Sequence, residues 1–333
     1  MEIQDLFINR AGRVRSGWRL AVFVVTFLVV LMVLQGLTFF GLGLLLSRES
    51  FDRVLDGWVI QSVIFLFLPA AVAGWACGFV LEELPWRALG WMPHRGWGRD
   101  LLLGVLFGAA SLGVAALLGV AFGGYRFALN DAAQTTLIVQ TLASSAFILL
   151  LGAAAEEMLF RGYPLQTLMR SWPLWAALIP SSVFFAAGHL WNPHVAPRFT
   201  FVNTFLAGVW LGVAYWRTRS MWFPLGLHWG WNWAMGAILG SPISGITELA
   251  PDPILRFSST GPEWFGGGAY GVEGGTACTL ALLVSTAYVW RTRLLSGTEE
   301  LRQFTDGENP NLSAAPLSNY LASAPADAPA DAP

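Results

Sequence analysis

Three ionisable residues follow a long apolar run in the middle of the chain. Glu156, Glu157 and Arg161 lie in the segment LLLGAAAEEMLFRGYP, and residues 132–155 before them carry no charge. An ionisable side chain at membrane depth costs about 3 kcal/mol, so these three are functional candidates. In a helix Glu157 and Arg161 share a face and can pair, whereas Glu156 is rotated about 100° from its neighbour and stays free for chemistry. The alternative is a buried ion-pair patch that only locks helices together, but two carboxylates against one guanidinium leave a surplus acid.

Two later apolar segments supply polar partners for this acid. His189 ends the run SSVFFAAGH, and taken alone a single histidine there is more readily explained as a satisfied core residue. His228 and Asn232, in LGLHWGWNW, are four residues apart and therefore share one helix face. Three glycines thin the same helix and let a neighbouring backbone approach: Gly226, Gly230 and Gly236. The polar face should point into the interior of a helix bundle.

The depth of these residues depends on where the helix that carries Glu156 ends. If it continues to Arg170, a rise of 1.5 Å per residue places the four polar residues within about 10 Å of depth near mid-membrane. Gly162 and Pro164 should, however, kink or end this helix. If the helix instead leaves the membrane at Arg161, the cluster needs a re-entrant turn or a water-filled cavity.

The chemistry that these groups favour is hydrolysis. Glu156 with the imidazole of His189 can hold and deprotonate a water molecule, and general-base help is worth about 10²–10⁴ in rate. His228 and Asn232 could donate hydrogen bonds to the developing oxyanion, often worth about 10²–10³. Alternatively, Glu156, His189 and His228 could hold a catalytic zinc ion with water as the fourth ligand. The sequence contains neither an HExxH zinc motif nor a Gly-x-Ser-x-Gly elbow, and both cysteines lie in apolar runs.

The composition is that of a polytopic membrane protein. Of the 333 residues 55% are hydrophobic and 12% charged, with a mean hydropathy of +0.55, whereas soluble domains carry about 25% charged residues. The net charge of −2 gives no reason to expect a nucleic-acid partner. We predict an all-α bundle of about eight transmembrane helices in the lipid bilayer. The predicted spans are residues 20–46, 58–81, 101–122, 137–160, 175–189, 201–216, 222–239 and 276–290.

The placement of arginine predicts the orientation in the membrane. All 19 basic residues are arginine, and with the predicted spans 14 of them fall on one side and five on the other. The arginine-rich side is cytoplasmic by the positive-inside rule, so both termini should be cytoplasmic and the membrane is predicted to be the plasma membrane. The absence of lysine, with much Ala, Gly, Pro and Trp, hints at a GC-rich bacterial genome.

The chain divides into six predicted regions. The loop rich in proline and glycine could cover the site as a lid, although a plain irregular connection is favoured. The end of the chain has a low-complexity Ala/Pro/Asp sequence that we expect to be disordered. In order, the regions are a cytoplasmic segment (1–19), three transmembrane helices with loops (20–136), a catalytic core (137–239), an extracytoplasmic loop (240–275), a last transmembrane helix (276–295) and a cytoplasmic tail (296–333).

The polar segments of the core resemble a known family. EEMLFRG, FAAGH and HWGWN occur in that order on apolar helices. They resemble the EExxxR, FxxxH and HxxxN motifs of the CPBP family of intramembrane metalloproteases, which includes CAAX prenyl endopeptidases and is also called the Abi family. The resemblance covers about residues 137–237.

The resemblance implies a role for each candidate residue. Glu156 would be the catalytic glutamate and His189 its partner in activating water. The oxyanion-stabilising pair and the supporting ion pair would be His228 with Asn232 and Glu157 with Arg161. The family name implies a divalent metal such as zinc as a cofactor, while the residues themselves allow hydrolysis with or without one.

We therefore predict a membrane-embedded endopeptidase that hydrolyses peptide bonds through Glu156-activated water. The partners would be a membrane-associated protein or peptide substrate and the lipid bilayer, while the sequence predicts no oligomeric state. Two other classes of protein fit the same residues. One is a transporter with the Glu/His/Asn cluster as a relay, and the other is a non-catalytic membrane scaffold that binds peptides, for example in bacteriocin immunity.

Overall fold

The computed structural model describes residues 4–9, 12–195, 197–299 and 301–302. Within these ranges the chain is all-α apart from one short sheet, as the sequence predicts. From residue 303 on, the predicted cytoplasmic tail lies outside the described residues, as does residue 300.

The long helices follow the apolar segments of the sequence. They are α2 (Ser16–Leu45), α4 (Leu68–Glu82), α5 (Trp97–Ala121), α6 (Thr135–Phe160), α8 (Leu174–Gly188), α9 (Pro197–Thr218), α10 (Trp222–Trp233) and α12 (Thr276–Arg291). The short α-helices are α1 (Gln4–Phe7), α3 (Arg48–Leu55), α7 (Tyr163–Met169) and α11 (Glu263–Gly266). The π-helices are η1 (Ile60–Phe67), which runs into α4, and η4 (Ala234–Ile238), which continues α10. The 3₁₀ turns are η2 (Trp86–Leu89), η3 (His189–Trp191), η5 (Gly268–Tyr270) and η6 (Val272–Gly274).

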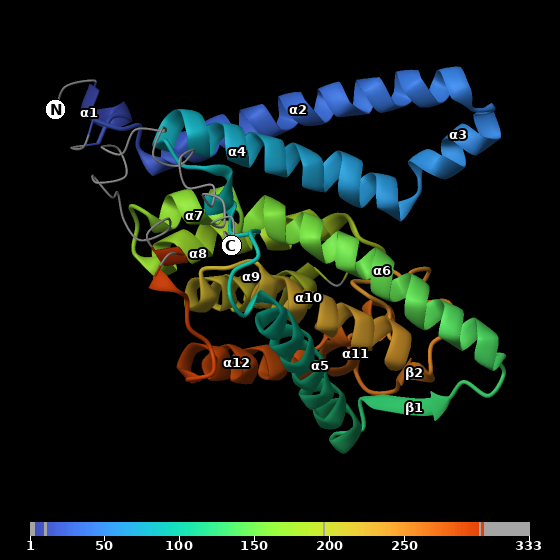
Figure 1. The fold of residues 1–333 in the computed structure, drawn as a ribbon. Coiled ribbons are helices and arrows are strands. Elements are labelled where there is room, and N and C mark those ends of the chain that lie inside the picture. Colours follow the sequence, from blue (N-terminus) through green and yellow to red (C-terminus); the bar gives the residue numbers. More distant parts are fainter. Residues whose placement is uncertain (1–3, 10–11, 196, 300, 303–333) are drawn as a thin grey trace, which may run out of the picture.

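The helices form a long antiparallel arm and a larger bundle beside it. Figure 1 shows α2 and α4, joined through α3, as the blue pair along one side of the molecule, with α6 next to them and α12 on the far side. The main hydrophobic core lies within the bundle, where residues of α8, α9, α10 and α12 pack together. The arm packs on the bundle through α2 against α7 and through η1 and α4 against α6.

Within the residues that the structure describes, six helical segments are long and apolar enough to cross a membrane, so the chain is an integral membrane protein. They are Ser16–Leu45, Ile60–Glu82, Trp97–Ala121, Thr135–Met169, Leu174–Trp191 and Arg198–Thr218. The prediction of about eight spans is not confirmed by the described residues. The other two predicted spans fold as α10 with 12 residues, continued by η4, and as α12 with 16 residues. At 1.5 Å per residue α12 rises only about 24 Å, less than the ~30 Å of a bilayer core.

A short antiparallel sheet was not anticipated from the sequence. β1 (Tyr125–Leu129) follows α5 and pairs with β2 (Leu255–Ser259), so that Tyr125 lies opposite Ser259. The sheet ties the loop of residues 240–275 to the end of α5, and this loop is therefore not wholly irregular.

Glycines bring α5 and α10 into direct backbone contact. A Cβ on Gly104 or Gly108 of α5 would overlap the backbone of α10 at Phe223 or Leu227. In return, a Cβ on Gly226 or Gly230 of α10 would overlap α5 at the carbonyl oxygens of Leu101 and Val105. This spacing of small residues on both helices is typical of close helix packing in membranes. The expected close approach at Gly226 and Gly230 is thus confirmed, and it fixes the helix that carries His228 and Asn232.

A buried cluster of ionised side chains joins the arm to the bundle. Glu82, at the end of α4, accepts hydrogen bonds from Arg19 of α2 (Nη1 to Oε1, 2.7 Å) and from Arg170, just after α7 (Nε to Oε1, 2.7 Å; Nη2 to Oε2, 2.9 Å). All three side chains are buried. Because each charge is hydrogen-bonded to an opposite one, the cluster fixes three elements at one end of the arm.

Candidate active site

Helix α6 ends within the charged segment that the sequence singled out. Its last two turns contain Glu156 and Glu157, and Arg161 is the C-cap, whose N–H donates to the carbonyl oxygen of Glu157. The chain turns at Gly162, where a Cβ would overlap the carbonyl oxygen of Met158. The next helix, α7, begins at once with a proline in its first turn. The break predicted from the glycine and the proline is therefore confirmed, and the helix resumes after it.

The pair predicted from the i, i+4 spacing is present and fully buried. Arg161 Nη1 lies 3.1 Å from Glu157 Oε1, and neither side chain is more than 1% exposed. The guanidinium also stacks on the ring of Phe185, 4.3 Å from its centroid, and donates to the carbonyl oxygen of Gly208 at 3.5 Å. Arg161 thus connects the end of α6 to α8 and α9.

Glu157 has a second partner that the sequence did not predict. Its Oε1 lies 2.9 Å from His228 Nδ1, and His228 is buried on α10. A carboxylate on Nδ1 fixes the proton at that nitrogen and the orientation of the ring, which leaves Nε2 directed elsewhere. Glu157 is therefore shared between a guanidinium and an imidazole, and it sets the position of His228.

Two indoles align α10 with α6. Trp229 Nε1 donates to the carbonyl oxygen of Ala146 at 2.9 Å, and Trp233 Nε1 donates to that of Leu142 at 3.0 Å. The donors are one turn apart on α10 and the acceptors one turn apart on α6, so the two helices are held in a defined register. This register, together with the glycine contact to α5, places His228 beside the end of α6.

Glu156 faces two imidazole nitrogens. Its Oε2 lies 3.9 Å from His189 Nε2 and 3.8 Å from His228 Nε2. The other ring nitrogen of His189, Nδ1, is 2.8 Å from the carbonyl oxygen of Phe185, so it carries a proton and donates to that oxygen. Glu156 Oε2 accepts no hydrogen bond from the residues that the structure describes. The separations are too long for direct hydrogen bonds but suit a bridging water.

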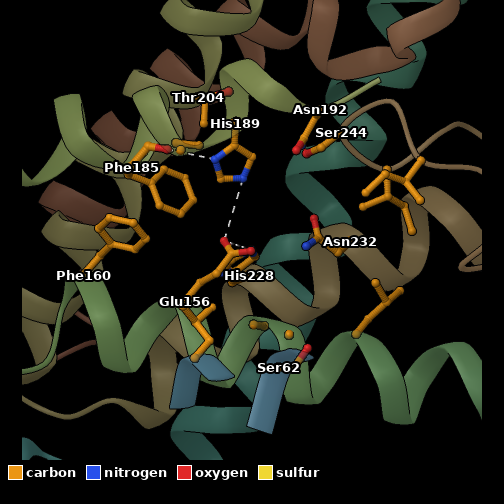
Figure 2. Close-up of a pocket in the computed structure, with 18 of the residues that line it drawn as sticks. Ser62, Glu156, Phe160, Phe185, His189, Asn192, Thr204, His228, Asn232 and Ser244 are labelled. Carbon is orange, nitrogen blue, oxygen red and sulfur yellow. Dashed lines mark hydrogen bonds and ion pairs between the residues drawn. The ribbon is translucent and has the colours of Figure 1, made fainter. Parts of the chain in front are cut away.

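All four predicted site residues line one cavity of about 590 Å³. They come from three helices: Glu156 from α6, His189 from the end of α8, and His228 and Asn232 from α10. Figure 2 shows Glu156, His189 and Asn232 around the open space, with the imidazole of His189 directed toward the carboxylate of Glu156. The arrangement can hold a water molecule between an acid and two imidazoles, with a carboxamide close by.

A comparison with known families gives a match to the part of the chain that contains the four cavity residues. Residues 138–234 match the model of the type II CAAX prenyl endopeptidase Rce1-like family. This part of the chain is an Rce1-like domain. The protein is therefore a membrane-embedded protease of the CAAX prenyl endopeptidase type, and its substrate is a protein or peptide. No curated protein matches the chain significantly.

The donor groups of the Rce1-like domain do not form a metal site as they are placed. Zinc bonds of about 2.0–2.2 Å in a tetrahedral site hold neighbouring ligand atoms roughly 3.3–3.5 Å apart. The distances from Glu156 Oε2 to His189 Nε2 and His228 Nε2 are wider, at 3.9 and 3.8 Å. Across the described ranges, no group of three or more His, Cys, Asp or Glu side chains could hold a metal ion. The predicted zinc set, Glu156 with His189 and His228, thus lacks the geometry of a metal site.

The Rce1-like site also contains polar residues that the sequence analysis missed. Asn192, Thr204 and Ser244 lie on the side of the cavity near His189, and Ser62 lies on the opposite side, near α6 (Figure 2). Asn192 follows His189 by one short turn, and Ser62 with the adjacent Gln61 interrupts an apolar span, so both left a signal in the sequence. The wall formed by the arm carries Leu31, Gln35, Trp58, Gln61, Ser62, Phe65 and Leu66.

The loop of residues 240–275 also lines the cavity of the Rce1-like domain. The sequence analysis favoured a plain irregular connection over a lid. In the structure five loop residues contribute to the cavity wall: Ile243, Ser244, Ile246, Leu249 and Glu273. The loop is therefore part of the site.

Proposed function

We propose that this protein hydrolyses peptide bonds of membrane-associated proteins or peptides by water that Glu156 activates. The observation that carries the proposal is the position of Glu156 Oε2, 3.8–3.9 Å from two imidazole nitrogens and without a hydrogen-bond partner among the described residues. A water molecule in this gap can donate to the carboxylate and to an imidazole at the same time. Its oxygen lone pair is then free to attack a carbonyl carbon.

In the proposed reaction Glu156 is the general base. It takes a proton from the water as the oxygen attacks, and it returns this proton to the leaving amine when the C–N bond breaks. His189 orients the water, because its Nδ1–H is fixed on the carbonyl oxygen of Phe185 and its Nε2 faces the carboxylate. The proton that Glu156 takes from the water is the one that the leaving amine receives, so the reaction balances with the water, the carboxylate and the peptide.

The oxyanion would be stabilised from α10. Asn232 lines the cavity one helical turn beyond His228, so both can reach the same carbonyl oxygen. Glu157 on Nδ1 stabilises a positive charge on the His228 ring, and the charged ring presents an Nε2–H donor to the cavity. We therefore assign His228 and Asn232 to oxyanion stabilisation and the pair Glu157–Arg161 to the support of His228.

The cavity supports a substrate that is held in the membrane. Apolar side chains of the arm and of α6 form much of the wall opposite His189. The family name makes a prenylated CAAX peptide the first substrate to test. All 19 basic residues are arginine, which suggests a bacterial origin, and a bacterial protein would act on another membrane-associated peptide.

We further propose that α10 with η4 and α12 complete about eight membrane crossings in the plasma membrane. The arginine bias of 14 to five supports cytoplasmic termini and an extracytoplasmic loop at residues 240–275.

The test is cleavage by purified protein in proteoliposomes. Fluorogenic peptides with a CAAX end, prenylated and unprenylated, serve as substrates. We expect Glu156→Gln to lower kcat by roughly 10²–10⁴, which is the contribution of a general base. Glu263→Gln is the matched control, because this carboxylate is exposed and lies outside the cavity. Cleavage at the wild-type rate by folded Glu156→Gln would reject the role of Glu156.

A further inference from the structure

The loop of residues 240–275 places one of its carboxylates in the wall of the catalytic cavity. Glu263 is exposed, but Glu273, on η6, is only partly exposed and lines the catalytic cavity. Glu273 is therefore the second acidic side chain in the cavity wall, on a different element from Glu156.

The carboxylate of Glu273 holds two other elements through three hydrogen bonds. Oε1 accepts a hydrogen bond from Trp231 Nε1 at 3.0 Å, and Oε2 accepts two from Ser244, from the backbone N–H and the hydroxyl, at 2.8 Å each. Trp231 is buried on α10, directly before Asn232. Glu273 thus connects the loop to the helix that carries the proposed oxyanion donors.

The segment that Glu273 holds is a tight turn against the cavity. Ile243 and Ile246 form two backbone hydrogen bonds with each other, each of 2.9 Å. Between them, Ser244 has a φ of +49° and Gly245 a φ of +84°. Two successive positive φ values define a type I′ turn, and a non-glycine residue needs support there. The two hydrogen bonds to Glu273 provide this support at Ser244.

The backbone around Glu273 is held in place by hydrogen bonds from α9. Asn203 of α9 donates from Nδ2 to the carbonyl oxygens of Glu273 (2.7 Å) and Gly275 (2.9 Å). Its Oδ1 accepts a hydrogen bond from Thr279 of α12 at 2.6 Å. Since Asn203 is buried, η6 is a fixed base from which the carboxylate reaches the turn.

We propose that Glu273 is a positioning residue that closes one end of the catalytic cavity. It fastens the turn Ile243–Ile246 as a cap over this end, and through Trp231 it holds the part of α10 that presents His228 and Asn232. This inference rests on the proposed function. The three donors that contact the Glu273 carboxylate belong to Trp231 and Ser244, and we therefore assign it to the geometry of the site rather than to contact with substrate.

The activity test compares Glu273→Gln with Glu263→Gln. The amide keeps one acceptor oxygen and cannot satisfy the donors on both sides. Because the affected groups act in the transition state, we expect kcat to fall roughly tenfold or more, the effect of one lost charge-assisted hydrogen bond, with KM changed less than about threefold. The exposed control should behave like wild type. A rise in KM at unchanged kcat would identify Glu273 as a substrate contact and would overturn the positioning role.

The proposed cap can also be tested by thiol labelling, a measurement that does not require cleavage activity. Cys278 of α12 is buried and lines the same cavity, so its thiol reports whether the cavity is open. We expect N-ethylmaleimide to label Cys278 roughly ten times faster in Glu273→Gln than in wild type, because the lost hydrogen bonds increase the open population. Loss of the Glu273 charge near Cys278 would also speed labelling, so Ser244→Ala, which keeps this charge, separates the two causes. Mass spectrometry of peptides separates this label from that on Cys77. The same labelling rate in Glu273→Gln and Glu263→Gln would overturn the cap.

A second variant covers the case in which Glu273→Gln does not fold. Ser244→Ala removes one of the two hydrogen bonds from the turn, and we expect faster labelling of Cys278 in that variant as well; unchanged labelling would count against the cap. If neither wild type nor any variant cleaves a peptide, the proposed function fails, while the labelling rates still decide whether Glu273 closes the cavity.

Discussion

Glu157 contacts both Arg161 and His228, so variants of this residue can test its effect on folding stability separately from its effect on catalysis. Glu157 Oε1 is shared by Arg161 Nη1 at 3.1 Å and His228 Nδ1 at 2.9 Å, and the carboxylate is fully buried. In Glu157→Gln the guanidinium remains buried without the carboxylate that pairs with it. Removal of one partner of a buried ion pair costs about 3–5 kcal/mol. We therefore expect the single variant to unfold at a clearly lower temperature and to lose cleavage activity.

A second substitution should restore stability alone. In Glu157→Gln with Arg161→Met no uncompensated guanidinium remains buried, and it is this charge that makes the single variant unstable. Most of the lost 3–5 kcal/mol should then return. Activity should stay low, because His228 Nδ1 has lost its carboxylate. Loss of a hydrogen bond to a charged group, worth about 1.5–3 kcal/mol, corresponds to roughly 10–100-fold in kcat.

The assay measures thermal unfolding in detergent and steady-state cleavage in proteoliposomes for wild type, both single variants and the double variant. Two results would refute the reasoning. Wild-type kcat in the double variant would mean that Glu157 only neutralises Arg161 and does not position His228. A double variant no more stable than Glu157→Gln would mean that the buried charge is not the source of the instability.

Two further pairs of variants test the scaffold. Gly230→Val should force α10 away from α5 and cost at least about 1–3 kcal/mol as well as most of the activity, while Gly113→Val, at a position with open space around it, should match wild type in both assays. Glu82→Gln should remove the carboxylate that the two buried arginines of its cluster share and lower stability by about 3–5 kcal/mol, with kcat of the folded fraction unchanged. Glu83→Gln, next in the chain and exposed, should have little effect on unfolding temperature; equal effects of Glu82→Gln and Glu83→Gln would contradict this.

The sequence predicted the parts of the site that depend on one helix at a time. The pairing of Glu157 with Arg161 follows from residues four apart on a helix, and the shared face of His228 and Asn232 follows in the same way. The break at Gly162 follows from local chemistry. Each of these predictions needs no knowledge of how helices pack.

The parts that depend on packing between distant segments could not be predicted. The contact of His228 with Glu157 requires the register of α10 on α6, which two indole hydrogen bonds set. The glycines of α10 predicted that the backbone of a neighbouring helix packs closely against α10, but their spacing does not indicate that this helix is α5. The turn at Ser244 and Gly245 did leave a signal, a Ser-Gly pair between two isoleucines, yet its position over the cavity depends on Glu273, 29 residues later.

The two sides of the cavity are built in different ways. On the side of α10, backbone lies directly on backbone through four glycines, so almost any enlargement there displaces the proposed catalytic groups. The arm of α2 and η1 lines the other side with side chains, and not with closely packed backbone. The ion pairs of Glu82 with Arg19 and Arg170 hold the arm at one end. Retargeting such an enzyme should therefore begin at Leu31, Gln35 and Gln61, where new shapes can be tried while the hydrolytic apparatus keeps its alignment.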